Sequence, residues 1–287
     1  MINTASILPG RLKPQMAILL WAAITFCGCA TKPAMATRAE PNQTGFTIFM
    51  IGDSTMADKP VIPPNPERGW GQMLPMYFQD GVRIENHAVN GRSSKSFLDE
   101  GRWEPVRNQL KPGDYIIIEF GHNDEKNKDP KRYTEPFGGF KENLELFVRE
   151  SRERGATPIL ATPVARRKFD DNGGLVDTHG DYVKAVREVA QEQRAPLLDL
   201  NLRSTELLTR LGPDSSKRLY DWIPAGEFER CPKGLSDDTH FNAYGASRMC
   251  DLAVGEIESN VPKLAFWLKR HSAADINHAG AEKSAGN

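Results

Sequence analysis

Four short segments of this 287-residue sequence carry the residue types that acyl transfer to water requires. Gly52-Asp53-Ser54 offers a serine hydroxyl as nucleophile, and Asp237 and His240 stand three residues apart near the C-terminal end. A histidine can take the serine proton while an aspartate orients the imidazole ring. The backbone amides of Ser54 and Gly91 and the side-chain amide of Asn123 could bind the oxyanion that then forms. The sequence therefore predicts a Ser-His-Asp hydrolytic site.

Each segment also has a purely structural alternative. A serine after a strand commonly caps a helix, Asn90-Gly91 is a strong turn dipeptide, and Asn123 could form an Asx-turn. The segment from Ser236 to Thr239 is typical of a helix cap, which would give Asp238 a structural role. Taken together the segments favour the hydrolytic site, because chance would have to place all four at one sheet edge in this order.

The elements that must position these residues alternate between strand-like and helix-like runs. Short β-rich runs divided by helices of ten or more residues predict βαβ units, a parallel sheet and helices on both of its faces. We therefore predict a three-layer α/β/α sandwich over residues 45–268, with a central parallel sheet of about five strands. The expected strands are 46–51, 82–89, 115–120, 158–161 and 196–200, and the expected helices are 140–154, 182–193 and 243–258.

In an open parallel sheet, ligands bind beyond the carboxyl ends of the strands. The first three predicted strands end directly before Gly52-Asp53-Ser54, Asn90-Gly91-Arg92 and Gly121-His122-Asn123-Asp124. The fourth leads to Arg166-Arg167-Lys168 a little further on. We expect these polar segments to gather at one edge of the sheet.

The two ends of the chain have a different character. Arg11 and Lys13 precede an apolar run of about a dozen residues, too short to span a bilayer but suited to an export signal. Gly28-Cys29-Ala30 follows, so residues 1–28 are typical of a lipoprotein signal that leaves Cys29 lipidated. Cleavage by an ordinary signal peptidase and a buried helix are the alternatives. We expect a flexible tether at 29–44, a disordered tail at 269–287, and a periplasmic or cell-surface location.

Composition and cysteine content agree with an exported globular protein. The net charge of −1, with 39% hydrophobic and 26% charged residues, gives no indication of nucleic-acid binding. In an oxidising compartment Cys231 and Cys250 could form a bridge, which would add about 3 kcal/mol of stability. Two free thiols are the alternative. No cysteine spacing indicates a metal site, and the sequence leaves the oligomeric state open.

The blocks Gly52-Asp53-Ser54, Gly91, Gly121-His122-Asn123-Asp124 and Asp237-x-x-His240 resemble those of the SGNH (GDSL) hydrolase superfamily. Segment 90–97, together with 101–103 and 119–124, is similar more narrowly to the rhamnogalacturonan acetylesterases, which deacetylate pectin. The resemblance implies the flavodoxin-like fold of the superfamily and no cofactor or metal. It implies Ser54 as nucleophile, Asp237 and His240 as the other triad members, and the amides of Ser54, Gly91 and Asn123 as oxyanion donors.

Pectin carries carboxylates, which arginine can bind through paired hydrogen bonds. We expect Arg92, Arg166 and Arg167 to bind the polymer and Trp103 to stack on a sugar, with a solvated or core role as the alternative for each. Two other functions remain open. A lipase or thioesterase of the same superfamily would prefer long acyl chains, and a surface glycan-binding protein would bind without hydrolysis. An acetylesterase that acts on another polysaccharide, such as xylan, is a further alternative. Further candidates are Lys95, Arg102 and Lys168 as cations for the carboxylates, and Trp70 and Trp222 as rings that stack on sugars.

Overall fold

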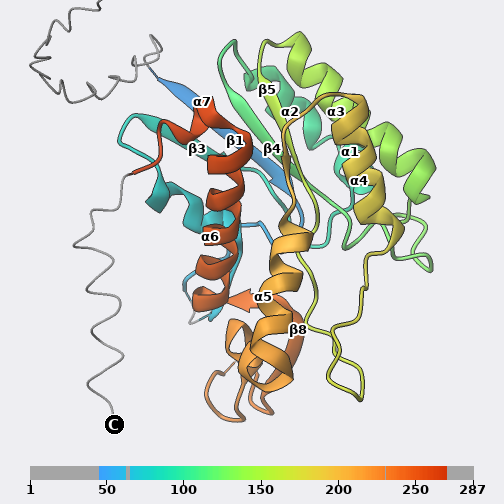
Figure 1. Cartoon of the computed structure of the whole chain (residues 1–287), viewed down its shortest axis with the longest axis vertical. Helices are drawn as coiled ribbons and strands as arrows, with labels where there is room; N and C mark the ends of the chain where they lie inside the picture. The colour runs from blue at the N-terminus through green and yellow to red at the C-terminus, as the bar shows by residue number, and fades with distance from the viewer. Residues whose placement is uncertain (1–44, 63–64, 230, 270–287) are drawn as a thin grey trace, which may run out of the picture. The chain divides into compact units, whose positions relative to one another are not determined.

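The computed structural model describes residues 45–62, 65–229 and 231–269. The predicted export signal, the lipidation site Cys29, the tether and the tail beyond residue 269 lie outside these ranges. The described chain forms a five-stranded parallel sheet in the order β3-β1-β4-β5-β6 (Figure 1). Its strands are β1 (Phe46–Gly52), β3 (Val82–Asn86), β4 (Tyr115–Glu119), β5 (Thr157–Ala161) and β6 (Leu197–Leu198).

The central strands β1, β4 and β5 bury both of their faces. In β1, Phe46, Ile48 and Met50 pack into one hydrophobic core, while Phe49 and Ile51 pack into a second core on the opposite face. A strand that is buried on both sides has no polar face, so its sequence is a nearly continuous apolar run. This is why the runs in the sequence predict the strands so directly.

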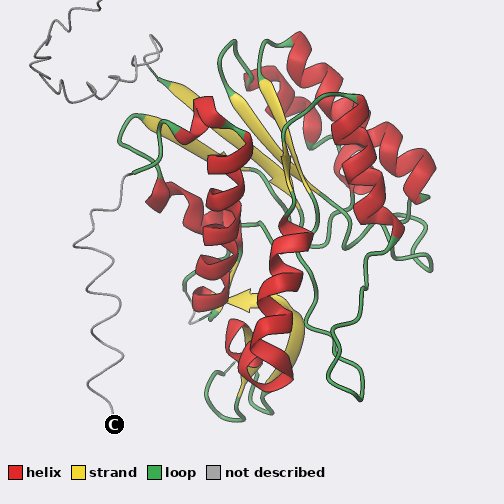
Figure 2. Cartoon of the chain, in the orientation of Figure 1, coloured by secondary structure: helices red, strands yellow, loops and turns green. Residues whose placement is uncertain are grey.

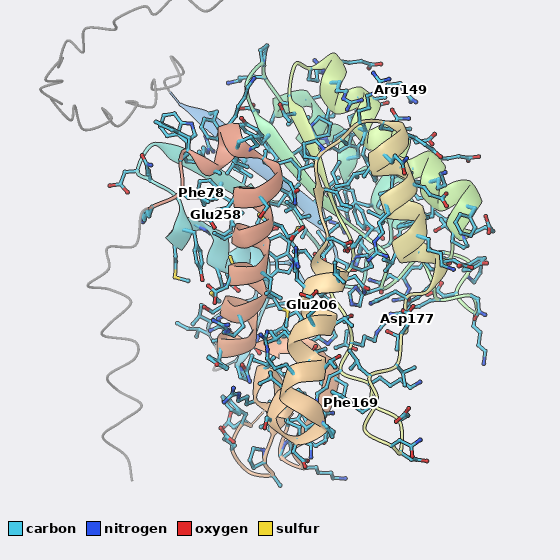
Figure 3. The ribbon with its side chains drawn as sticks, viewed as in Figure 1. Phe78, Arg149, Phe169, Asp177, Glu206 and Glu258 are labelled. Atoms are coloured by element: carbon cyan, nitrogen blue, oxygen red, sulfur yellow. The ribbon has the colours of Figure 1, made fainter. Side chains whose placement is uncertain are left out.

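Helices cover both faces of the sheet, which confirms the predicted three-layer α/β/α architecture (Figure 2). Figure 3 shows side chains filling the space between the layers. The core on one face is built by α1 (Ser94–Asp99), α2 (Trp103–Gln109), η2 (Pro136–Phe140), α3 (Lys141–Glu153) and α4 (Asp181–Glu192). The core on the other face is built by η1 (Trp70–Tyr77), α5 (Leu200–Ser215), η3 (Ser216–Leu219), α6 (Ala243–Asn260) and α7 (Pro262–Ala265).

The helices α1, α2, α5 and α7 were not expected from the sequence, and α5 shortens the last strand. The apolar run at 196–200 predicts a five-residue strand, but Leu200 already begins α5. The side chain of Asp199 caps this helix by accepting a hydrogen bond from the Leu202 amide. Gly212, with a φ of 71°, then breaks the regular helical geometry near the end of the helix.

A small antiparallel sheet, also unexpected, lies outside the main sheet. It contains β2 (Glu67–Arg68), β8 (Leu235–Asn242) and β7 (Tyr220–Ile223), in that order. Tyr220 pairs with Phe241 and Trp222 pairs with Ser236, so residues 237–240 form an irregular bulge between two regular pairs. The sequence predicts Asp237 and His240 on a turn before the last helix. They lie instead in this bulge, which bends the strand and redirects its side chains.

The predicted bridge between Cys231 and Cys250 is wrong, because both are free thiols. Cys250 lies in α6 and is fully buried among apolar side chains of the core. Cys231 lies in the loop between β7 and β8 and is partly exposed. Burial raises the pKa of the Cys250 thiol, which keeps it protonated and unreactive. Among the described helices, none is both long and apolar enough to cross a membrane.

Candidate active site

Ser54, His240 and Asp237 form a continuous chain of contacts. The Oγ atom of Ser54 lies 2.9 Å from Nε2 of His240, and Nδ1 of His240 lies 2.8 Å from Oδ2 of Asp237. The backbone amides of Thr239 and His240 donate to Oδ1 of Asp237 at 2.7 Å and 2.9 Å. Backbone amides of the bulge in β8 therefore hold the Asp237 carboxylate, and the carboxylate in turn orients the imidazole of His240. This arrangement can move a proton away from a serine hydroxyl.

The charges around the hydrogen-bonded residues Asp237 and His240 suit His240 to act as a base. Burial opposes the charge on Asp237, but hydrogen bonds from His240 and the backbone outweigh it and lower the Asp237 pKa to about 2. Burial would also lower the pKa of His240, yet the neighbouring Asp237 reverses this and raises the pKa above its ordinary value. Asp237 is thus ionised at neutral pH, and it stabilises the protonated imidazole that proton transfer from serine would create.

The end of β1 presents Ser54 at the edge of the sheet. Gly52 is required there, because a Cβ atom at this position would lie 2.7 Å from the backbone oxygen of Glu119. Asp53 is fully buried, and its Oδ1 accepts hydrogen bonds from the amide and the hydroxyl of Thr55, each at 2.9 Å. Its Oδ2 lies 3.4 Å from Nδ1 of His122. Asp53 therefore holds the turn that carries Ser54 rather than facing a ligand.

A buried carboxyl group, Glu119, lies beneath this turn. It accepts hydrogen bonds from Trp70 Nε1 at 2.7 Å and from the Val164 amide at 3.2 Å, and Thr55 Oγ1 lies 3.5 Å away. Burial and the charge on Asp53 raise the pKa of Glu119 to about 8, so it is largely protonated at neutral pH. Trp70 is therefore fixed in the core, and the prediction that it stacks on a sugar is wrong.

The turns after the neighbouring strands β1, β3 and β4 supply N–H groups at one edge of the sheet. The amides of Ser54 and Gly91 donate no hydrogen bond to another residue within the described chain. Gly91 has a φ of 76°, a backbone conformation that glycine adopts without strain. Asn123 donates from Nδ2 to the backbone oxygen of Arg92 at 3.1 Å. An amide nitrogen carries two hydrogens, so one remains available to a ligand. These three groups can bind an oxyanion.

A second buried carboxyl group holds the two loops together. Asp124 accepts hydrogen bonds from the amide and hydroxyl of Ser94 and from the hydroxyl of Thr134. Burial raises its pKa to about 7, although the hydrogen bonds from Ser94 oppose the shift. Ser93 caps α1 through a reciprocal pair of hydrogen bonds with Ser96. Asp124 thus fixes Asn123 relative to the segment that follows Gly91.

Comparison with known proteins agrees with this geometry. Residues 50–248 match the model of the GDSL-like lipase/acylhydrolase family. The chain belongs to this family. It is an ester-hydrolysing enzyme.

Two relatives of this GDSL-family enzyme come from Bacillus subtilis. The rhamnogalacturonan acetylesterase RhgT is 39% identical over 226 residues, which are 78% of this chain and 93% of that protein. The probable rhamnogalacturonan acetylesterase YesY is 34% identical over 211 residues, which are 74% of this chain and 92% of that protein. The crystal structure of YxiM, from the same organism, is 30% identical with a TM-score of 0.64, and the match covers 75% of this chain and 57% of that one.

The GDSL-family enzyme holds some of its predicted substrate-binding residues against protein partners, and Trp103 is the first of them. Trp103 is only 4% exposed and packs edge-on against Phe147, while its Nε1 donates to Glu150 at 2.7 Å. The prediction that Trp103 stacks on a sugar is wrong, because it belongs to the hydrophobic core behind α1 and α3. Arg92, in contrast, is partly exposed and pairs with Glu100 at 3.0 Å, so its predicted role stays a prediction.

Arg166 and Arg167 are held by the protein itself. Arg167 is 6% exposed, pairs with Asp238 at 2.6 Å and lies over the rings of Trp222 and Phe169, the latter labelled in Figure 3. The prediction that Arg167 binds the polymer is wrong, since its guanidinium joins the end of α5 to β8.

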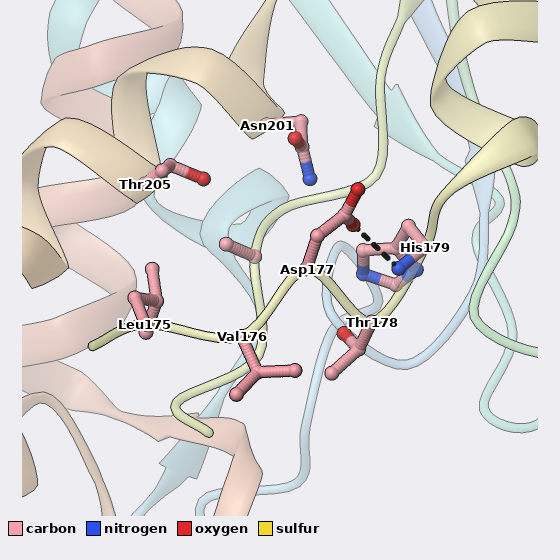
Figure 4. A pocket seen from close by; sticks show the side chains of 8 residues that line it. Leu175, Val176, Asp177, Thr178, His179, Asn201 and Thr205 are labelled. Carbon is pink, nitrogen blue, oxygen red and sulfur yellow. Dashed lines mark hydrogen bonds between the residues drawn. The ribbon is translucent and has the colours of Figure 1, made fainter. Parts of the chain in front are cut away.

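Arg166 pairs with Glu125 and donates to the backbone oxygen of His122. It also contacts Thr178, which lines a separate pocket of about 170 Å³ with Asp177 and His179 (Figure 4). Both nitrogens of His179 are engaged, by Glu125 and by the Val164 oxygen. Arg166 therefore acts within the protein, and its predicted contact with the polymer is not supported by its surroundings.

The sequence reasoning missed a buried ion pair beside the triad. Lys59 is 3% exposed, and its Nζ lies 2.7 Å from Glu67 and 2.5 Å from Oδ1 of Asn90, which precedes Gly91. Glu67 lies in β2, which pairs with β8 next to His240. Lys59 thus connects the strand that carries the histidine to the loop that carries an oxyanion donor. No motif indicates this pair, because it depends on a contact between two loops.

We expect this ion pair to set the pH profile of the enzyme. The charge on Glu67 raises the pKa of His240, and the charge on Lys59 lowers it. Because neutral histidine is the base, kcat/KM falls about tenfold per pH unit below that pKa. Glu67→Gln should therefore move the acidic limb to lower pH, and Lys59→Met should move it to higher pH. The measurement is kcat/KM for p-nitrophenyl acetate from pH 4 to 9.

The double variant Lys59→Met/Glu67→Gln is the control, and its acidic limb should lie close to that of the wild type. Loss of activity at every pH without movement of the limb would mean that the pair only supports the fold. Thermal unfolding of the three variants separates that case from an electrostatic one.

Proposed function

We propose that this enzyme is an exported carbohydrate esterase that removes acetyl groups from pectic polysaccharide, with rhamnogalacturonan as its substrate. The hydrogen-bonded chain from Ser54 through His240 to Asp237 carries the proposal for the chemistry. The name of RhgT, which this chain matches over 93% of that protein's length, supports the proposal for the substrate. The catalytic roles below belong to the same proposal.

In the first step His240 Nε2 takes the proton of Ser54 Oγ as this oxygen attacks the acetyl carbonyl. The amides of Ser54 and Gly91 and the side chain of Asn123 hold the oxyanion. The sugar oxygen then leaves with the proton from His240, and acetyl-Ser54 remains. In the second step His240 takes a proton from water, the hydroxide attacks the acetyl group, and acetate departs as Ser54 regains its hydrogen.

Acetate release from three polymers tests the substrate. We expect faster release from acetylated rhamnogalacturonan than from acetylated homogalacturonan or acetylated xylan at equal ester concentration. Release from xylan at an equal or higher rate would refute the pectic assignment while leaving the esterase intact. Comparison of p-nitrophenyl acetate with the octanoate addresses the lipase alternative, and a preference for octanoate would refute the acetylesterase assignment.

The export part of the proposal rests on the N-terminal segment, where a short apolar run precedes Cys29. We propose that Cys29 becomes the lipidated first residue of the mature enzyme. Metabolic labelling with a fatty acid should mark the wild type and not Cys29→Ser. Labelling of both proteins, or of neither, would refute the lipid anchor.

A further inference from the structure

Two cations from the loop after β4 lie against the side-chain oxygen of Asn123. Lys126 Nζ donates to Oδ1 of Asn123 at 2.8 Å, and Arg132 Nη1 donates to the same atom at 3.4 Å. Arg132 Nη1 also lies 3.9 Å from the position of a Cβ atom at Gly91. Both cations are therefore next to the groups that can bind the oxyanion, and neither belongs to the motifs that the sequence analysis singled out.

We propose that Lys126 and Arg132 form a binding site for the carboxylate of a uronic acid residue in the substrate. The inference rests on the proposed function, because it assigns a further part of the same substrate. A hexuronate ring carries its carboxylate and its acetylated hydroxyls on one six-membered ring. A carboxylate site within the width of one sugar ring from the oxyanion groups is therefore the place where such a ring would present its charge.

Lys126 forms no direct ion pair with a carboxylate of the described residues. Within that part of the chain, the one hydrogen bond of its Nζ is to Asn123. An ammonium group has three donors, so two remain for a ligand. Lys126 is exposed at the surface. Desolvation is the largest cause that lowers the pKa of Lys126, the charges of Arg132 and Arg166 lower it further, and the charges of Asp53 and Glu125 oppose the shift.

Arg132 is fixed in place but keeps part of its guanidinium free. Its Nε donates to Asp129 at 2.5 Å, and the Asp129 carboxylate also accepts the Lys131 amide. Nη2 of Arg132 makes no hydrogen bond within the described residues. One third of the side chain is exposed. A guanidinium that is oriented by one carboxylate and open on its other edge is prepared to bind a second one.

The need to orient Asn123 does not by itself explain why two cations contact its Oδ1 atom. Its amide already donates to the Arg92 oxygen, and a single donor to Oδ1 would complete the fixation. A second cation adds repulsion between Lys126 and Arg132, which costs free energy until an anion binds between them. Like charges held together beside a reaction site are typical of a site for the opposite charge.

The experiment compares one acetylated sugar with and without its charge. The substrates are an acetylated galacturonate oligosaccharide and the same compound with its carboxyls methyl-esterified. The variants are Lys126→Gln and Arg132→Gln, with Lys128→Gln as the matched control, since Lys128 is an exposed cation of the same loop. We expect wild type to prefer the free acid, and each test variant to lower kcat/KM for the acid about tenfold relative to the ester, mainly through KM.

Each outcome decides between the subsite and its alternatives. An equal decrease for the acid and the ester would mean that the cations only orient Asn123, and it would overturn the subsite. The same selective loss in Lys128→Gln would replace the subsite by a general surface charge. Wild type that hydrolyses both sugars equally well refutes the subsite and leaves the proposed function intact. Wild type that hydrolyses p-nitrophenyl acetate but neither sugar refutes the proposed function and the subsite together.

Discussion

Ser54→Ala is expected to lower kcat for p-nitrophenyl acetate by about 10⁶-fold, the scale of loss when the serine of such a triad is removed. The hydroxyl of the adjacent Thr55 cannot replace Oγ, because it donates to Asp53 and lies 3.5 Å from Glu119. His240 would then have no protein group to deprotonate. Because the variant removes one atom from a position that is 9% exposed, its stability should change by only about 1 kcal/mol.

A second measurement makes this prediction independent of residual activity. A fluorophosphonate should label wild type at Ser54 in a peptide map, and it should not label Ser54→Ala. Ser259→Ala is the matched control, since Ser259 is an exposed serine of α6 whose hydroxyl bonds only to a helix carbonyl. Activity of Ser54→Ala within about tenfold of wild type, or labelling at another serine, would refute the nucleophile assignment.

The main sheet could be predicted from the sequence because both of its faces are buried. A continuous apolar run such as Ile116 to Ile118 places side chains in both cores at once, and a polar loop follows it. The small sheet could not be predicted in this way. Glu67-Arg68 has only two residues and a polar composition, and β8 contains Ser236, Asp237 and Asp238, which favour turns.

The residues of the site likewise fall into a group that the sequence predicted and a group that it did not. Ser54, Gly91 and Asn123 follow predicted strands, so the fold itself accounts for their gathering at one edge of the sheet. Side-chain type does not reveal burial, however. Trp103 and Arg167 have the chemistry of sugar-binding residues, yet both are buried against protein partners.

The cations beside the site are residues that the sequence did not single out. Lys59 has no motif around it, and its position depends on a contact between segments that are far apart in sequence. Lys126 and Arg132 lie three and nine residues after Asn123 in one irregular loop, and only the course of that loop turns them back onto Asn123. Lys59 and Asn90, for example, are 31 residues apart. The contact of Lys59 exists only in the tertiary structure, and those of Lys126 and Arg132 depend on loop geometry that no helix or strand periodicity encodes.

Asn123→Ala carries the second largest expected effect. Removal of one oxyanion donor typically lowers kcat by about 10² to 10³-fold. The loss should fall on kcat and leave KM for p-nitrophenyl acetate nearly unchanged, since the donor acts on charge that develops only in the transition state. Asn127→Ala is the control, because Asn127 is exposed in the same loop and donates to the Glu125 oxygen through its backbone amide, which the substitution keeps.

Asn123→Asp distinguishes the loss of the N–H donor from a change in the conformation of the loop. The aspartate has nearly the same size, and Lys126 and Arg132 would attract its carboxylate, so the loop should keep its conformation. A carboxylate has no hydrogen to donate and repels the oxyanion, so kcat should fall at least as far as in Asn123→Ala. If Asn123→Asp instead kept most of the wild-type kcat, the side chain would act by positioning the loop, and the oxyanion would depend on the amides of Ser54 and Gly91 alone.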